Sequence, residues 1–167
     1  MDVRLAFLLS RAEEALPRLQ ALGLGAEVYL DPALLEEDAL FQSLRRRLPG
    51  RVSVHLPFWN LDLLSPDPGV RALTLRGLLF GLDRAAERGA DRAVFRSGIP
   101  HGRTPEEALE RALPLAEALG LVVRRARTLG GRRLLAHSPE PCPEVLRPVL
   151  EAHAGELGFC FDAAHAR

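Results

Sequence analysis

Short apolar runs alternate along the chain with longer segments in which apolar residues recur every three or four positions. Runs of this kind predict strands, and the period of the longer segments predicts amphipathic helices. The expected strands are residues 3–9, 26–30, 52–56, 92–96, 132–137 and 158–161. The expected helices are residues 11–22, 32–48, 69–88, 105–129 and 143–154. Alternating strands and helices call for parallel strands with crossover helices, which is an α/β fold.

The ends of these helices carry capping signals. Ser10 with Glu13 reads as a capping box, and Asp67-Pro68 reads as a cap followed by a proline at the first helical position. Gly23 follows the last periodic residue of its helix, where a left-handed residue is expected. These signals predict defined helix boundaries.

The fourth helical segment allows two interpretations. Pro114 lies inside it, which predicts either a kinked helix or two shorter helices. In a competing interpretation, residues 121–125 form a strand and Gly130-Gly131 forms a hairpin turn.

The length of 167 residues indicates a single α/β domain over residues 1–167. Two architectures fit the order of elements: a doubly wound open sheet, and a (β/α)₈ barrel, which needs roughly 200–250 residues. The turn at residues 10–14 contains no glycine-rich phosphate loop. Dinucleotide binding therefore has no motif to support it.

Composition removes several classes of protein. All 22 basic residues are arginine, and the absence of lysine excludes enzymes that use a Schiff-base lysine or a P-loop lysine. The 22 acidic residues make the net charge zero, so nucleic-acid binding is not expected. One asparagine and 13 prolines are typical of a thermophile. Cys142 and Cys160 lack metal-type spacing and indicate a reducing cytoplasm. No segment is apolar enough to predict a membrane span, so we expect a cytoplasmic protein.

Chemistry is expected where strands end, because parallel α/β folds bind ligands at the carboxyl ends of their strands. Three of the five histidines follow or end predicted strands. They are His55, His137 and His165. Arg96 and Asp162 occupy the same kind of position.

Several of these strand ends carry motifs. The third reads His55-Leu56-Pro57-Phe58-Trp59, the fifth continues into Ser-Pro-Glu-Pro at residues 138–141, and the sixth reads Gly-Phe-Cys-Phe-Asp-Ala-Ala-His at residues 158–165. Together they resemble the xylose isomerase-like barrel superfamily, which contains metal-dependent sugar isomerases and epimerases and the type IV apurinic-site endonucleases. The resemblance implies an incomplete (β/α)₈ TIM-type barrel of about six βα units, with parallel strands inside and helices outside.

The resemblance also implies a site. His55, Asp162 and His165 match family positions that contact metal or substrate, and His137 stands near the position of a family glutamate and could replace it as a nitrogen ligand. Histidines combined with one aspartate suit zinc, and manganese is the other divalent metal considered. Without the resemblance, the position of His55 at a strand end favours a buried histidine that is hydrogen-bonded to a backbone carbonyl.

Two family ligands are replaced in this sequence. Arg96 stands where endonuclease-like members have a histidine, and a protonated guanidinium cannot bind a metal. At the end of the fifth strand, Ala136 and His137 stand where the family has its metal-binding glutamate. Arg96, Trp59, His101 and Arg103 are the candidate substrate-binding residues.

Three functions follow from these positions. The first is a metal-dependent sugar isomerase or epimerase with a degenerate site. The second is a non-catalytic relative that binds a small polyol or phosphate. The third, an apurinic-site phosphodiesterase, is disfavoured by the neutral charge and by Arg96. Six strands also leave two open barrel edges, so we expect either that the natural chain continues past Arg167 or that a second copy of the chain covers these edges.

Overall fold

The computed structural model describes residues 3–29, 38–57, 60–96, 112–130, 133–138, 147 and 150–161. The strands are β1 (Arg4–Leu8), β2 (Gly25–Tyr29), β3 (Val52–His55), β4 (Arg92–Arg96), β5 (Arg133–Ser138) and β6 (Leu157–Phe161). The helices are η1 (Leu9–Arg11), α1 (Ala12–Leu22), α2 (Asp38–Arg47), α3 (Pro68–Glu87) and α5 (Ala112–Thr128). Residues 147 and 150–152 are also helical. The predicted strands are therefore confirmed within two residues at their described ends.

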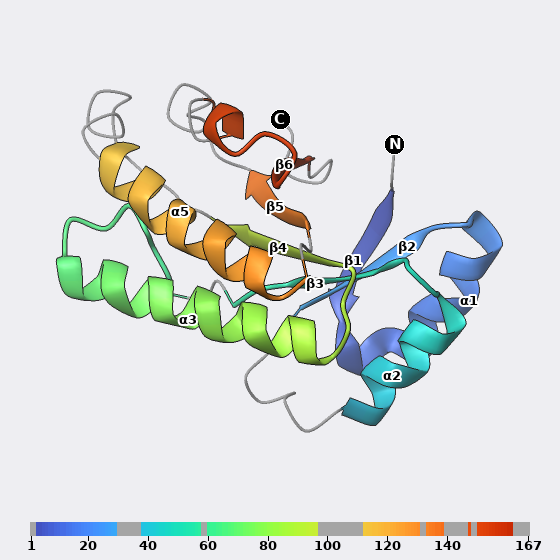
Figure 1. The fold of residues 1–167 in the computed structure, drawn as a ribbon. Coiled ribbons are helices and arrows are strands. Elements are labelled where there is room, and N and C mark those ends of the chain that lie inside the picture. Colours follow the sequence, from blue (N-terminus) through green and yellow to red (C-terminus); the bar gives the residue numbers. More distant parts are fainter. Residues whose placement is uncertain are drawn as a thin grey trace.

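The six strands form one parallel sheet in the order β1-β2-β3-β4-β5-β6. A doubly wound sheet reverses its strand order partway, whereas a TIM barrel adds each strand beside the previous one. In Figure 1, α3 and α5 lie side by side over one part of the curved sheet, and α1 and α2 lie beside the strands near β1. The architecture is part of a TIM barrel, as the motifs implied.

The two faces of the sheet differ in polarity. Alternate residues of the central strands, including Val28, Val54 and Phe95, belong to the hydrophobic core that the helices cover. Their neighbours point to the opposite face, because successive side chains of a strand alternate. That inner face holds Glu27 and Ser53, which are buried although polar. The helices therefore pack on an apolar outer face, and the inner face is available for polar chemistry.

Helix α3 begins at the predicted cap. The Asp67 side chain accepts a hydrogen bond of 2.7 Å from the Gly69 amide, and Pro68 is the first helical residue. Gly23 ends α1 with a positive φ of 62°, as predicted. Helix α5 runs through residues 121–125 and carries Pro114 in its first turn, so the strand-and-hairpin alternative is wrong.

The predicted capping box at Ser10 is wrong. Ser10 lies inside η1, and the residue preceding α1 is Arg11, whose side chain makes no capping hydrogen bond. The chain turns directly after β1 because this turn buries Leu9 and Ala12 against the core, and Ser10 is therefore part of η1 and does not precede α1. Arg11 instead donates to Glu14 over 2.8 Å.

Arginine-carboxylate pairs connect elements that are distant in sequence. Arg4 of β1 donates to both carboxylate oxygens of Asp91, over 3.0 and 2.7 Å, at the amino end of β4. Arg125 of α5 similarly donates to Asp83 of α3, over 2.7 and 2.9 Å. The hydrogen bond with Asp83 raises the pKa of Arg125.

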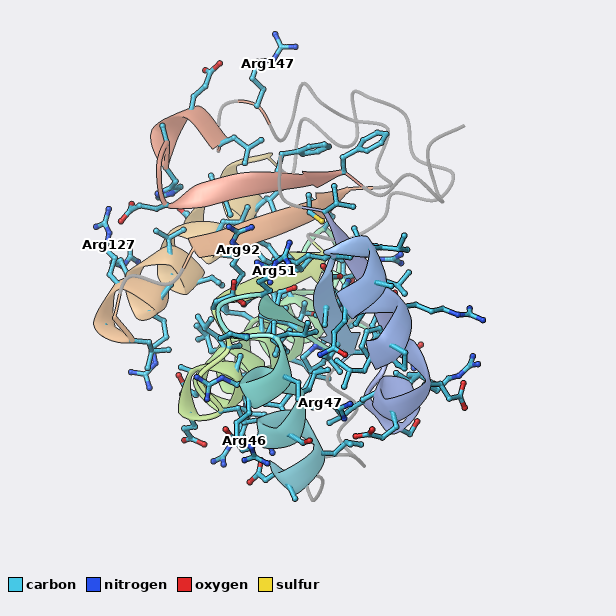
Figure 2. All side chains as sticks on the ribbon, turned by 90° about the vertical axis from the view of Figure 1, so that its right-hand side faces the viewer. Arg46, Arg47, Arg51, Arg92, Arg127 and Arg147 are labelled. Atoms are coloured by element: carbon cyan, nitrogen blue, oxygen red, sulfur yellow. The ribbon has the colours of Figure 1, made fainter. Side chains whose placement is uncertain are left out.

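Several arginines gather at the amino end of the barrel, opposite the predicted site. Figure 2 shows Arg51 and Arg92 near the middle of this end, with Arg46 and Arg47 on α2 and Arg127 on α5 around them. Because helices run antiparallel to the strands, their carboxyl ends lie here, and arginine is favourable at that end of the helix dipole. The three arginines at residues 45–47 form the last turn of α2 in this way.

Among the described helices, including α3 with its 20 residues, none has the length and apolar composition needed to cross a lipid bilayer.

Candidate functional site at the carboxyl ends of the strands

The candidate site lies where β2 to β6 end. Parallel pairing places Tyr29 beside His55, and it places Arg96 beside His137. His55 is in turn the neighbour of Val94, two residues before Arg96. Strands in a sheet lie about 4.8 Å apart, so these positions share one small region of the inner face.

His55 is the best-defined member of this region. Its side chain is only 2% exposed, and its Nδ1 lies 2.8 Å from the carbonyl oxygen of Leu56. A carbonyl can only accept, so Nδ1 carries the hydrogen, and in the neutral imidazole the lone pair is on Nε2. Both sequence interpretations of His55 are therefore compatible with one geometry, because metal-binding histidines commonly donate their other N–H to a carbonyl.

Leu56 continues the same turn. Its amide donates to the carbonyl oxygen of Val94 over 2.7 Å, which joins the exit of β3 to β4. Leu56 thus orients His55 through its carbonyl while its own amide is bound to the sheet, and its side chain is fully buried. The imidazole is anchored to a rigid part of the backbone.

Tyr29 forms one wall beside His55. The ring centroids are 5.0 Å apart, and the ring planes are inclined by 37°. The arrangement follows from the parallel register, which pairs Tyr29 with His55 across β2 and β3. Tyr29 is partly exposed, so its ring borders the site and also limits the positions open to the imidazole.

Arg96 ends β4 and brings a fixed positive charge to the site. It is partly exposed, and its Nε is buried. Its neighbour in register is His137 of β5, which is itself paired with Cys160 of β6. The backbone thus places a cation directly beside one predicted metal ligand.

The other predicted site residues lie outside the described part of the chain. They are Asp162, His165, Trp59, His101 and Arg103. For His137 the structure describes the strand and its register but not the side chain. Among the described residues, no three His, Cys, Asp or Glu side chains form a group that could hold a metal. The roles of these residues as ligands therefore stay predictions.

Two residues of this region were missed by sequence reasoning. Tyr29 is the only tyrosine of the chain and falls near the end of an apolar run, and Cys160 was considered only for its spacing from Cys142. Their alternation with the outward residues Val28 and Phe159 is the signal that could have placed them on the inner face. That signal becomes clear only when the face of the sheet that the helices cover is known.

Comparison with known proteins identifies relatives by structure. No protein-family model and no curated protein matches the chain. The chain is similar to the TTHB071 protein from Thermus thermophilus, soaked with ZnCl₂, at 89% identity and a TM-score of 0.83, covering 99% of this chain and 68% of that one. A D-tagatose 3-epimerase-like protein is 20% identical, with a TM-score of 0.75 and coverage of 99% and 66%. Endonuclease IV from Thermus thermophilus is 21% identical, with a TM-score of 0.58 and coverage of 99% and 64%.

The chain therefore spans about two thirds of the length of these solved structures. At 20% and 21% identity the epimerase-like protein and the endonuclease show the fold alone. The 89% identity to the Thermus protein shows that the two proteins are homologous over nearly the whole of this chain. The sequential parallel strands, their outer helices and these relatives lead to one conclusion: the chain belongs to the family of the TTHB071 protein and has the fold of the xylose isomerase-like TIM barrels.

Proposed function

We propose that this chain forms the larger part of a divalent-metal-dependent isomerase or epimerase that acts on a sugar or a similar polyol. The metal is held at the carboxyl ends of the strands by His55, Asp162 and His165, with His137 as a further ligand. The single observation that carries the proposal is the hydrogen bond from His55 Nδ1 to the Leu56 carbonyl, because it fixes the tautomer in which Nε2 is the basic nitrogen, the arrangement common among metal-binding histidines.

The donor set fits a borderline transition metal. Neutral imidazole nitrogens together with one carboxylate favour zinc, whereas magnesium prefers oxygen ligands. A ZnCl₂ soak of the TTHB071 protein makes zinc the first metal to test, with manganese second. The same identity of 89% supports the thermophilic source that the composition predicts.

Each residue of the site has a task in this proposal. A divalent ion, when bound, polarises the carbonyl and hydroxyl oxygens of a keto-sugar. His55 is held in one tautomer by Leu56 and in one orientation by Tyr29. Arg96 supplies charge-assisted hydrogen bonds to substrate oxygens, and Trp59 stacks on the sugar ring. His101 and Arg103 complete the binding of an anionic group where the substrate carries one.

Metal analysis of the purified protein is the decisive experiment. We expect zinc or manganese to co-purify or to raise the melting temperature, and we expect His55→Ala to lose most of this effect. His153→Ala is the matched control, since His153 lies between helical residues 150–152 and β6, away from the strand exits. A wild-type protein that neither binds nor responds to these metals contradicts the proposal.

Substrate assays then separate the family activities. The metal-loaded protein is incubated with ketohexoses, and the sugars are separated by chromatography, while a parallel assay measures cleavage of an abasic-site DNA duplex. Epimerised or isomerised sugar with intact DNA supports the proposal. Cleavage of the DNA with unchanged sugars would favour the phosphodiesterase instead.

Arg96 favours a second candidate, a non-catalytic protein that binds a small polyol or phosphate. Its guanidinium occupies the end of β4 beside His137 and supplies positive charge without any metal. This candidate predicts phosphate or polyol binding by calorimetry in the presence of EDTA. Arg96→Gln is then expected to abolish that binding, whereas it leaves metal binding in place under the first proposal.

A further inference from the structure

Helix α3 carries a buried glycine, Gly81, where the helix meets the turn that follows β3. A Cβ atom added at Gly81 would lie 2.7 Å from Cδ of Pro57 and 3.4 Å from Cδ2 of Leu56. Carbon atoms in van der Waals contact stand about 3.5–4.0 Å apart, so the first of these distances leaves no room for a side chain. The helix and the turn are therefore packed so closely that only glycine fits between them.

The atom nearest to position 81 belongs to the peptide group that holds His55. Cδ of Pro57 is bonded to the nitrogen of the peptide bond between Leu56 and Pro57. The carbonyl of that same bond is the one to which His55 Nδ1 donates over 2.8 Å. A peptide group is planar and rigid, so Cδ and the carbonyl oxygen move together. A displacement of Pro57 therefore displaces the hydrogen-bond acceptor of the imidazole.

Helix α3 is the more rigid of the two partners in this contact. Its residues Leu78, Leu82 and Ala85 are at most 1% exposed and belong to the hydrophobic core. Close-packed cores resist displacement. Pro57, by contrast, is partly exposed. A collision between them is therefore expected to move the Leu56–Pro57 peptide and to leave the helix in place.

A second contact holds the later part of the turn on the same helix. The Asp62 amide donates to the hydroxyl of Thr74 over 2.9 Å, and this hydroxyl donates to the Val70 carbonyl over 2.8 Å within α3. Thr74 precedes Gly81 by seven residues, which is about two helical turns, so both residues lie on the same side of α3. The turn is thus fixed along the helix, and Gly81 sets how closely it approaches at the end that carries His55.

We propose that Gly81 is a positioning residue for His55: because it carries no side chain, the Leu56–Pro57 peptide lies where its carbonyl accepts the hydrogen of Nδ1. A helix on the outer face of the sheet (Figure 1) thereby controls the tautomer and orientation of a histidine at the candidate site. The inference rests on the proposed function for the metal that His55 binds. Its effect on the tautomer needs no metal and is tested separately.

Nitrogen NMR of isotopically labelled histidine rings tests the inference in the metal-free 167-residue chain. A ring nitrogen that carries hydrogen and one that carries a lone pair differ in chemical shift, and His55→Ala identifies the signals of His55. We expect the hydrogen on Nδ1 in the wild type and a mixture of both tautomers in Gly81→Ala, because the displaced carbonyl no longer holds one of them. The Kd for zinc should rise about tenfold in Gly81→Ala, as when other groups that orient a ligand are changed.

Two further variants separate positioning from helix packing in general. Gly77→Ala makes the same exchange in α3, but its Cβ would lie 3.4 Å from the nearest atom of Leu61, an ordinary contact, so the tautomer of His55 and the Kd for zinc should stay at wild-type values. Pro57→Ala removes Cδ. In a Pro57→Ala background, Gly81→Ala should change the Kd by less than about twofold, because the two substitutions are coupled through that atom.

Three results overturn the proposal. The first is a wild-type His55 that carries its hydrogen on Nε2, which is measured without any variant. The second is a Gly81→Ala protein with the wild-type tautomer and Kd. The third is an effect of Gly81→Ala that is equally large with and without Pro57. A tautomer that changes as expected in a chain that binds no zinc would support the role of Gly81 and contradict the proposed function.

Discussion

The imidazole of His55 lies against the phenol ring of Tyr29, with the ring centroids 5.0 Å apart. The two residues end adjacent parallel strands, 26 positions apart in the sequence, and the register pairs them directly. Together with the Leu56 carbonyl on Nδ1, this contact fixes the imidazole from two sides. Metal affinity is sensitive to such neighbours, because they orient the ligand before the metal arrives.

Replacement of Tyr29 is therefore expected to weaken metal binding without removing a ligand. Tyr29→Leu should raise the Kd for zinc about tenfold, the lower end of the range seen when groups around a ligand are changed. Tyr29→Phe keeps the ring and should bind zinc like the wild type. Competition with a chromophoric chelator measures both constants, and equal losses in the two variants would assign the effect to the hydroxyl group instead.

Arg96 offers a test of the lost ligand position. Arg96→His places an imidazole beside His137 in register and removes the positive charge, whereas Arg96→Gln removes only the charge. We expect Arg96→His to bind zinc about tenfold more tightly than Arg96→Gln, because one nitrogen donor is added to the site. Isothermal titration of the two variants makes the comparison. Identical affinities would mean that position 96 does not point to the metal.

The pair between Arg4 and Asp91 stabilises the amino end of the sheet. Their side chains are 8% and 25% exposed, and two hydrogen bonds join them. Arg4→Met leaves the Asp91 carboxylate without this partner, so the free energy of unfolding should fall by about 3 kcal/mol. Urea denaturation measures the loss.

A surface pair provides the control for this prediction. Arg11 and Glu14 are 67% and 69% exposed, and Arg11→Met should cost less than about 1 kcal/mol. If Arg4→Met and Arg11→Met lower the free energy of unfolding equally, burial does not increase the contribution of the Arg4 pair to stability.

The cap of α3 is expected to contribute to stability on its own. Asp67→Ala removes the acceptor for the Gly69 amide and should lower the free energy of unfolding by about 1 kcal/mol. Asp67→Asn retains a side-chain oxygen and should stay close to the wild type. Thermal and urea unfolding of both variants check the difference, and a loss in Asp67→Asn equal to that in Asp67→Ala would point to charge rather than capping.

The contact between Arg127 and Glu156 predicts a pH dependence. The hydrogen bond from Arg127 holds the pKa of Glu156 below its ordinary value, with a smaller favourable charge effect from the same guanidinium and from His153. A lowered folded-state pKa adds stability that is present above the ordinary glutamate pKa and is lost as the pH falls through the lowered value. Glu156→Gln should therefore be less stable than the wild type at pH 7, and this difference should vanish in acid.

Salt provides an independent check, because the pair is exposed and screening weakens it. The difference between Glu156→Gln and the wild type at neutral pH should shrink in concentrated sodium chloride. Glu151→Gln, an exposed helical position nearby, is the control and should show no such dependence. A constant difference across pH and salt would contradict an electrostatic origin.

Local patterns predicted most of the elements because their causes are local. Asp67-Pro68 begins α3 through bonds within three residues, and Gly23 ends α1 because its own backbone takes a positive φ. Ser10 failed as a cap because burial of Leu9 decided where the chain turns after β1. His55 was recognised from its strand and motif, whereas Tyr29 was not, since its importance comes from a neighbour in another strand.

The sequence by itself determined the order of strands and helices, the parallel fold and the strand ends at which chemistry is expected, because periodicity and capping act over a few residues. Only the tertiary structure decided which face of each strand is turned inward, since that depends on where the helices pack. It also joined Arg4 to Asp91, 87 positions away, and set Tyr29 against His55. Such contacts arise from sheet register, which forms only when the whole chain folds and distant strands align.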